Sequence, residues 1–461
     1  MLKRLVLAMF MLAGAPAVAA PCDIDGDWDG TLLAGAIKLR VSFHIATQNG
    51  MAGGTMTSVD QGNLVLPLSS VTCDAPNVVL AVDKIHGAYQ ATLAPDGKSM
   101  SGSWSQGGAV LPLMVTRRGP GQTGFLVRRP QEPHPPFPYR SEDVVFDGPG
   151  GIKLAGTITI PNGSGAFAAV VLIQGSGPHD RDEAIMGHKP FLVLADYLTR
   201  HGIATLRVDK RGIANSTGDY AAATSLDFAD DAQAAIAYLK SRPQIDRAKI
   251  GLIGHSEGGI IAPIVAARDA SVAFIVLMAG PGIPGDILLE LQSRLINAGM
   301  GASKEQVEHN ADLQRRLIAA VKSAKDTGDA QTKAKAIMDA LPPGAETQAA
   351  TAQIATLASP WFRFFLNYDP AVYLRQVKCP VLAIDGEKDL QVPPKEDLAG
   401  IRAALAGNPD VQTIELPGLN HLMQTATTGL PAEYGDIEET MAPIVLETIT
   451  TWIVKHTSGH P

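Results

Sequence analysis

The fold of the larger part of this chain is decided by residues 249–260, which read KIGLIGHSEGGI. An apolar strand leads into the pattern Gly254-x-Ser256-x-Gly258, and a second apolar stretch follows. Glycines on both sides allow a tight strand-to-helix reversal that leaves the serine in a strained, exposed backbone conformation. The segment therefore predicts a nucleophilic serine at the carboxyl edge of a parallel sheet.

A histidine that can act as general base for this serine lies near the C-terminus. In sites of this kind the histidine follows the last strand. Residues 414–421 read IELPGLNH, an apolar strand that runs into a loop ending at His421, which we predict as the base. His255 adjoins the serine, but its side chain is expected to turn away and pack against the turn. Three further histidines are expected in loops or at the surface: His179, His188 and His201.

The group that orients the histidine is expected after an earlier strand. Residues 381–392 read VLAIDGEKDLQV and place Asp385, Glu387 and Asp389 at the end of one predicted strand. Asp385 is constrained by the sheet, and the longer side chain of Glu387 would hold an imidazole poorly. We predict Asp389, because it follows the turn and can aim a short carboxylate at His421.

Acyl transfer also needs N–H donors for the negative oxygen of its intermediate. One is expected from the backbone of Glu257, directly after the serine. The other is expected from the loop QGSGP at residues 174–178, where we predict the N–H of Ser176, with Gly175 as the alternative. A phosphate-binding loop is a competing interpretation, but this stretch lacks both the Lys-Ser/Thr pair and the G-x-G-x-x-G spacing.

Apolar strands alternate with helical stretches around these motifs. After a predicted hairpin within residues 144–160, strands are predicted at 169–173, 204–208, 250–253, 273–278, 381–384 and 411–416. This alternation indicates a mostly parallel sheet covered by helices on both faces. No strand is predicted between Pro284 and Pro370. We therefore expect an α/β domain at 141–461 with a helical cap at about 284–370.

These motifs, together with DKRG at residues 209–212, resemble the α/β-hydrolase superfamily over residues 144–454. Bacterial carboxylesterases related to the prolyl-oligopeptidase clan are the most similar group. The resemblance implies an eight-stranded sheet and a two-step reaction through an acyl-enzyme, without a cofactor. Ala214 departs from the pattern by replacing a commoner glycine, in a region that is more often structural. The stretch Asp-Arg-Asp at 180–182 is expected to form a solvated ion pair rather than a metal site.

The N-terminal part of the chain has a different pattern. Residues 22–118 alternate apolar and polar residues over short runs separated by turn residues, which indicates an all-β, barrel-like domain. It is similar to the small lipocalin-like barrels that precede the catalytic domain in some exported bacterial hydrolases. An accessory role is expected, and a ligand-binding barrel is the alternative. The proline-rich residues 119–140 predict a semi-rigid linker.

The first 19 residues have the composition of a secretory signal peptide. Lys3 and Arg4 precede a short apolar run, and an A-x-A cleavage site ends at Ala19. The run is shorter than the roughly 20 residues that a membrane span needs. We therefore expect a periplasmic or secreted protein with no membrane span after cleavage.

The chain has three cysteines. Cys22 and Cys73 are close enough in sequence to pair in an oxidising compartment, or they remain two free thiols, and the sequence leaves both open. Cys379 begins an apolar strand and is expected to be a buried, inert thiol.

Composition narrows the class of partner. The chain carries 38 Lys and Arg against 46 Asp and Glu, a formal charge of −8, with no basic run. This argues against a nucleic-acid partner. The predicted partner is a small-molecule ester.

Three functions fit the motifs. The first is an exported serine hydrolase that cleaves esters of short or medium acyl chains. The second is a serine peptidase or acyl-CoA thioesterase that uses the same three residues. The third is a binding protein with a vestigial hydrolase domain, against which the intact set of Ser256, Asp389 and His421 argues. The aromatic run WFRFF at 361–365 either roofs an acyl pocket or anchors the cap to the core.

Overall fold

The computed structural model describes residues 22–458 apart from 35–36, 49, 62–63, 120, 123, 126–127 and 341–353. The predicted signal peptide lies outside the described residues. Internal contacts divide the chain into two compact units. The first holds most of the residues up to Gly124, and the second holds the residues from Phe125 onward together with Leu33–Arg40 and Ser58–Leu64. No described helix combines the length and the apolar character that a bilayer span requires.

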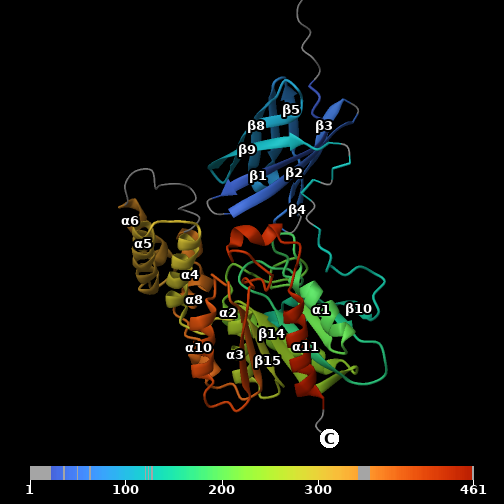
Figure 1. Ribbon diagram of the computed structural model, residues 1–461, viewed down its shortest axis with the longest axis vertical. Helices are drawn as coiled ribbons and strands as arrows, with labels where there is room; N and C mark the ends of the chain where they lie inside the picture. Colours follow the sequence, from blue (N-terminus) through green and yellow to red (C-terminus); the bar gives the residue numbers. More distant parts are fainter. Residues whose placement is uncertain are drawn as a thin grey trace, which may run out of the picture. The chain divides into compact units, whose positions relative to one another are not determined.

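The first unit is an all-β sheet of nine strands. They are β1 (Gly26–Ala34), β2 (Ile37–Gln48), β3 (Met51–Ser58), β4 (Leu64–Pro67), β5 (Ser70–Asp74), β6 (Asn77–Val82), β7 (Gly87–Leu93), β8 (Ser99–Gln106) and β9 (Ala109–Arg117). Their order is β4-β3-β2-β1-β9-β8-β7-β6-β5, and the pairs from β1 through β9 to β5 are antiparallel (Figure 1). The predicted all-β domain is confirmed as a curled, open sheet, because β4 and β5 are its two edge strands and do not pair with each other among the described residues.

Period-two alternation places large aromatic side chains in the core of this unit. Phe43 stacks on Tyr89 with 5.6 Å between ring centroids, and Trp104 packs beside Phe43. The Tyr89 hydroxyl donates a hydrogen bond to the Met100 carbonyl oxygen at 2.7 Å, so its polar end is satisfied in the core. Cys22 and Cys73, whose pairing the sequence left open, form a disulfide with Cα atoms 6.0 Å apart.

The second unit is built on an eight-stranded mixed sheet. Its strands are β10 (Arg140–Asp147), β11 (Lys153–Ile160), β12 (Phe167–Ile173), β13 (Ala204–Val208), β14 (Ile245–His255), β15 (Ile275–Met278), β16 (Val381–Gly386) and β17 (Val411–Leu416). The order is β10-β11-β13-β12-β14-β15-β16-β17. The predicted hairpin β10–β11 is antiparallel and pairs with β13, and the strands from β13 to β17 are parallel. The predicted α/β sheet is confirmed.

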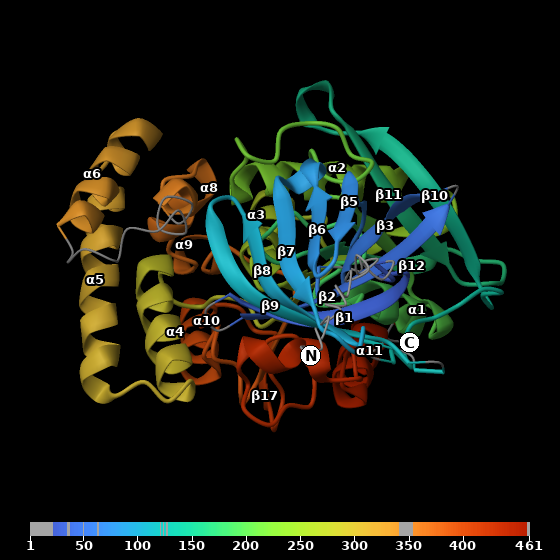
Figure 2. The ribbon, with the colours of Figure 1, turned by 90° about the horizontal axis from the view of Figure 1, so that it is seen from above.

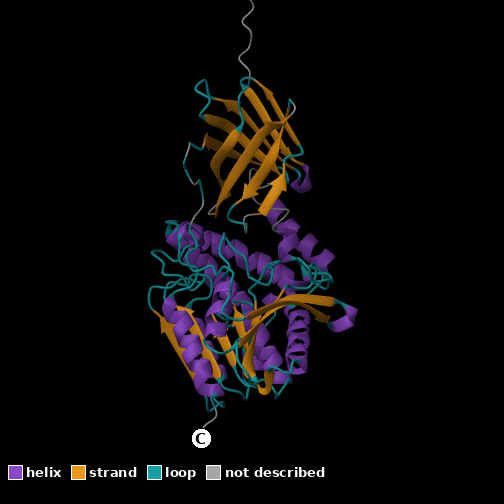
Figure 3. Cartoon of the chain, turned by 90° about the vertical axis from the view of Figure 1, so that its right-hand side faces the viewer, coloured by secondary structure: helices purple, strands orange, loops and turns teal. Residues whose placement is uncertain are grey.

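Helices cover both faces of this sheet (Figure 3). They are α1 (Pro190–Arg200), α2 (Ser225–Ser241), α3 (Gly258–Arg268), α10 (Pro394–Ala404) and α11 (Pro443–Thr457). One core cluster packs α1 and α11 against the sheet, and another packs α2, α3 and α10. The chain passes from β12 to β13 on one side and then to β14 on the other. Such a reversal opens a crevice at the carboxyl ends of β12 and β14, where ligands of open α/β sheets bind.

The segment between β15 and β16 is helical where the structure describes it. It contains α4 (Gly285–Gly299), α5 (Lys304–Lys322), α6 (Thr327–Asp339), α8 (Pro360–Leu366) and α9 (Ala371–Leu374). Figure 2 shows α4 beside α5, and residues of α5 contact both α4 and α6. The start of α5 is fixed by a capping box, in which Ser303 and Gln306 each bond the other's backbone N–H.

Candidate active site

Ser256 lies at the turn between β14 and α3. Its backbone φ is +52°, a conformation that a residue with a side chain adopts at an energetic cost. A Cβ on Gly254 would collide with the Gly258 carbonyl, and a Cβ on Gly258 would collide with the carbonyl of Ile173 in β12. Both glycines are therefore required for the close approach of β12, β14 and α3, and this packing holds the serine at the crevice.

A continuous hydrogen-bond relay joins Ser256 to two residues from distant segments. The Ser256 hydroxyl lies 3.1 Å from Nε2 of His421, and Nδ1 of His421 lies 2.6 Å from Oδ2 of Asp389. With Nδ1–H donating to the carboxylate, Nε2 is free to accept the serine proton. The structure thus brings together the three residues that the sequence analysis selected, in an arrangement suited to nucleophilic chemistry.

The carboxylate of Asp389 is held in a fixed orientation. Its side chain is fully buried, and its Oδ1 accepts hydrogen bonds from the backbone N–H groups of Gln391 at 2.7 Å and Val392 at 2.9 Å. Glu387 is directed elsewhere, because its Oε2 accepts from the backbone N–H of Gly418 at 2.8 Å. Of the carboxylates that follow β16, Asp389 is the one that contacts His421.

The loop after β12 lies directly against the serine. A Cβ on Gly175 would be only 3.2 Å from the Cβ of Ser256. The N–H of Gly175 donates to Oε1 of Glu183 at 2.5 Å, so this alternative oxyanion donor is already engaged. The N–H groups of Ser176 and Glu257 have no acceptor among the described residues. The two predicted donors therefore remain available to a ligand.

The structure contains a buried ion pair near the serine that the sequence analysis did not predict. Nδ1 of His255 lies 2.9 Å from Oε1 of Glu183, and Nε2 lies 3.0 Å from the backbone oxygen of His421. Both partners are acceptors, so the ring carries both protons. Burial alone would lower the pKa of His255, but the adjacent Glu183 carboxylate raises it above its ordinary value. His255 does turn away from Ser256, as expected, but as one half of this pair.

Glu257 is the centre of a second buried network. Its carboxylate accepts from Lys210 Nζ at 2.9 Å, from the Ser225 hydroxyl at 2.7 Å and from the Trp361 indole at 2.5 Å. Lys210 also donates to the Gly175 carbonyl oxygen at 2.7 Å. Helices α2 and α8 and the loop after β12 are thereby tied to the residue that follows the serine. Sequence spacing gave no indication of this convergence.

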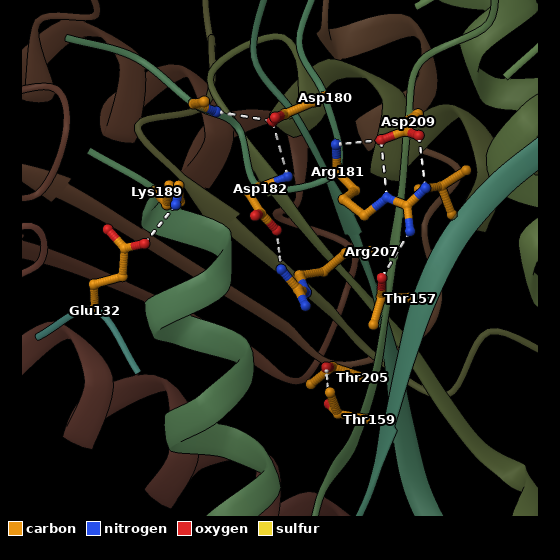
Figure 4. A network of polar contacts seen from close by, with 12 residues as sticks. Glu132, Thr157, Thr159, Asp180, Arg181, Asp182, Lys189, Thr205, Arg207 and Asp209 are labelled. Carbon is orange, nitrogen blue, oxygen red and sulfur yellow. Dashed lines mark hydrogen bonds and ion pairs between the residues drawn. The ribbon is translucent and has the colours of Figure 1, made fainter. Parts of the chain in front are cut away.

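The stretch 180–182 differs from its expected solvated form (Figure 4). The Arg181 guanidinium makes two parallel bonds to the buried Asp209 carboxylate, at 3.0 and 2.8 Å, and a third to Thr157. Asp182 pairs with the buried Arg207. These ion pairs are largely buried because the loop folds back over β13. Within the described ranges, no group of three or more His, Cys, Asp or Glu side chains could hold a metal ion.

His188 lies in the loop before α1, as expected, but it is buried there. It is fully buried, with Nε2 2.9 Å from the Tyr434 carbonyl oxygen and Nδ1 3.0 Å from the Thr440 hydroxyl. Its loop is held against the segment that precedes α11, which lies far away in sequence. His188 makes no contact with the Ser256 relay and has a structural place in the unit.

Comparison with known proteins places these features in a family. Residues 170–429 match the model of the alpha/beta hydrolase family. Esterase EstD of Thermotoga maritima is 29% identical over 324 residues, which cover 69% of each protein. Two solved structures are similar to 69% and 68% of this chain, each over its full length. They are the alpha/beta hydrolase GrgF from Penicillium sp. sh18, with 19% identity and a TM-score of 0.44, and Est1E from Butyrivibrio proteoclasticus with bound ferulic acid, with 14% identity and a TM-score of 0.41.

Proposed function

This chain belongs to the alpha/beta hydrolase family, and from that membership we propose that it is an exported serine esterase acting on carboxylic esters of short or medium acyl chains. The observation that carries the proposal is the relay from Ser256 through His421 to the buried carboxylate of Asp389. The similarity to esterase EstD supports an ester rather than an amide or a thioester as substrate.

The proposed reaction proceeds in two steps. His421 Nε2 takes the proton of the Ser256 hydroxyl as Oγ attacks the ester carbonyl, and Asp389 stabilises the imidazolium that forms. The imidazolium then protonates the departing alcohol, which leaves an acyl group on Ser256. Water then attacks this acyl-enzyme as His421 takes its proton, and His421 returns that proton to Oγ as the carboxylic acid leaves, which restores the serine.

Two backbone N–H groups would stabilise the negative oxygen of both tetrahedral intermediates. We assign this role to Ser176 and Glu257. Their N–H groups have no acceptor among the described residues, and the loop that carries Ser176 lies against the serine. Removing one such donor costs about 10²–10³ in kcat where this has been measured in a comparable site.

We further propose that helices α4, α5, α6, α8 and α9 cap the site and restrict it to small acyl groups. Trp361 of α8 supports this placement, because its indole donates to Glu257 directly after the serine. The Cys22–Cys73 disulfide fits an oxidising compartment, in agreement with the proposed cleavage of residues 1–19 and export to the periplasm or the medium.

The substrate class is tested by a panel of model substrates. We expect the purified protein to hydrolyse p-nitrophenyl acetate and butyrate fastest, with kcat/KM falling towards the palmitate. Aminoacyl-nitroanilides and acyl-CoA should turn over far more slowly. Preference for an anilide or for acyl-CoA would make the chain a peptidase or a thioesterase. No turnover of any of them would favour a binding protein.

A further inference from the structure

We propose that Asp385 is a positioning residue whose carboxyl group stays protonated and donates a hydrogen bond to Asp389. This inference rests on the proposed function, because it concerns the acid of the same relay. It adds a fourth member to the relay, next to Asp389.

Asp385 lies where a charge would be costly. It is the penultimate residue of β16, a strand paired on both sides by β15 and β17, and it is 1% exposed. Its Oδ1 accepts from the backbone N–H of Gly386 at 2.8 Å. The turn after β16 is closed by the backbone N–H of Asp389, which donates to the Gly386 carbonyl oxygen at 2.9 Å, and it brings the Asp389 carboxylate close enough for its charge to act on Asp385. Within the described part of the chain, no N–H or O–H reaches its Oδ2.

The pair of carboxyl groups requires a proton, because two adjacent carboxylates cannot both be ionised in a buried site. Asp389 accepts from two backbone N–H groups and from Nδ1 of His421, and these three donors favour its ionised form. Asp385 accepts from one N–H only. The proton therefore belongs to Asp385, and its Oδ2–H is the group free to donate.

The surrounding charges favour the same assignment. Asp397 of α10 is buried on the same face of the sheet, and its Oδ1 accepts from the N–H groups of Gly282 and Ile283. The charged groups that act on Asp385 most strongly are the carboxyls of Asp389 and Asp397, while His421 faces Asp389. Burial, followed by the negative charge of Asp389, raises the pKa of Asp385 well above its ordinary value.

A neutral donor in this place would act on the relay through Asp389. It fixes the plane of the Asp389 carboxylate, so that Oδ2 stays aligned with Nδ1 of His421. It also draws negative charge away from Oδ2. Without this donor, Asp389 would hold the imidazolium more tightly.

Two variants separate this role from a structural one. Asp385→Asn keeps an N–H donor in a side chain of the same shape, and we expect kcat within about threefold of wild type with the same acidic limb in the pH profile of kcat/KM. Asp385→Ala removes the donor, and we expect a loss of about tenfold in kcat and an acidic limb shifted to higher pH. Glu387→Gln is the matched control, because Glu387 bonds the Gly418 backbone instead.

Infrared spectroscopy detects the proton directly. Wild type at neutral pH should show the C=O stretching band of a protonated carboxylic acid that is missing from Asp385→Asn and retained in Glu387→Gln. Burial raises the pKa of Asp397 to about 7, so the spectra are also recorded at pH 5, where Asp397 is protonated in all three proteins and its band cancels in the difference spectrum. This readout and the Asp385→Asn kinetics decide the matter even if Asp385→Ala does not fold.

The inference is overturned if Asp385→Asn folds but is inactive, if no such band is lost, or if folded Asp385→Ala has wild-type kcat and an unshifted pH profile. The proposed function fails separately. If Ser256→Ala still hydrolyses esters, the relay takes no part in the reaction and the proposed function is wrong. The infrared band would still report the proton on Asp385 in that case.

Discussion

Near β16, two carboxylates of the same chemistry have different roles because their surroundings differ. Asp389 is fully buried and bonds His421, whereas the exposed Glu387 bonds the backbone of Gly418 in the next loop. Their carboxylates are two positions apart in sequence. Backbone donors and burial, rather than residue type, select the one that can orient an imidazole.

We expect Asp389→Asn to lower kcat by about 10²–10⁴, because the amide would offer a donor to Nδ1 and impose the wrong tautomer on His421. Glu387→Gln should lower kcat by less than about tenfold. The measurement is kcat for p-nitrophenyl butyrate, with circular dichroism to check folding. A folded Asp389→Asn enzyme with wild-type kcat would assign the acid to another residue.

Residues of the relay could be predicted from sequence because each follows a recognisable strand in a fixed chain order. Glu183 could not be predicted, since its partner His255 is 72 positions away and the contact depends on a loop in which Glu183 itself has a φ of +53°. The burial of His188 was missed for the same reason. Its partners lie in the segment before α11, and no local pattern points to them.

At the scale of elements, the Glu183–His255 pair joins two loops and the end of β14 around the serine. Glu183 bonds the loop after β12, and His255 at the end of β14 bonds the backbone of His421 after β17. The pair therefore couples the loop of Ser176 to the loop of the base. Breaking it should affect stability in a cooperative way.

We expect Glu183→Gln and His255→Gln each to lower the free energy of unfolding by about 3–5 kcal/mol, because each leaves a buried group without its partner. The double variant should lose less than the sum of the two, with a coupling of about 1–3 kcal/mol. Guanidinium unfolding at neutral pH measures all four proteins. Additive losses would show that the two side chains do not act as a pair.

Helix α8 is anchored to the core by its aromatic residues. Phe365 is buried in the main cluster and stacks on Trp361 at 5.4 Å, and Trp361 donates to Glu257. We expect Phe365→Ala to lower the free energy of unfolding by about 3–5 kcal/mol and to leave the acyl-chain preference unchanged.

Exposed Val372 of α9 provides the control, since Val372→Ala should change the free energy of unfolding by no more than about 0.5 kcal/mol. The assay combines chemical unfolding with the chain-length profile of kcat/KM. A shift towards longer acyl groups without loss of stability would make Phe365 part of the pocket instead.

The strands of the second unit were predictable because they are continuous apolar runs between helices. Strand β14 begins at Ile245, earlier than its predicted start at residue 250. The prediction was too short because residues 245–249 include charged side chains, yet Ile245 pairs with Phe167 of β12. In the first unit, alternation predicted strands but not whether the sheet closes. Closure depends on strand number, tilt and stagger, which local patterns do not encode.

At the scale of the whole molecule, stability should depend on pH through His188. Burial, followed by the positive charge of Arg129, lowers the pKa of His188 to about 4, against an ordinary value of 6.5. Below pH 6.5 the His188 side chain becomes protonated in the unfolded chain, whereas in the native protein it stays neutral until the pH approaches 4. The free energy of unfolding should therefore fall by about 3 kcal/mol between pH 7 and pH 4 through this residue.

The check is guanidinium unfolding at several pH values for wild type and His188→Gln. The glutamine variant should be less stable at pH 7 but should lose about 3 kcal/mol less on acidification. Equal losses in the two proteins would mean that other groups set the acid sensitivity.

The central claim is that Ser256 carries the acyl group, and labelling by a fluorophosphonate probe tests it most directly. The account predicts stoichiometric modification of wild type at Ser256, found by mass spectrometry of its peptides, together with loss of ester hydrolysis. Ser256→Ala should keep its fold, because the serine side chain lies at the crevice, and should show neither labelling nor turnover. Modification at another residue, or ester hydrolysis at the wild-type rate by Ser256→Ala, would contradict the account.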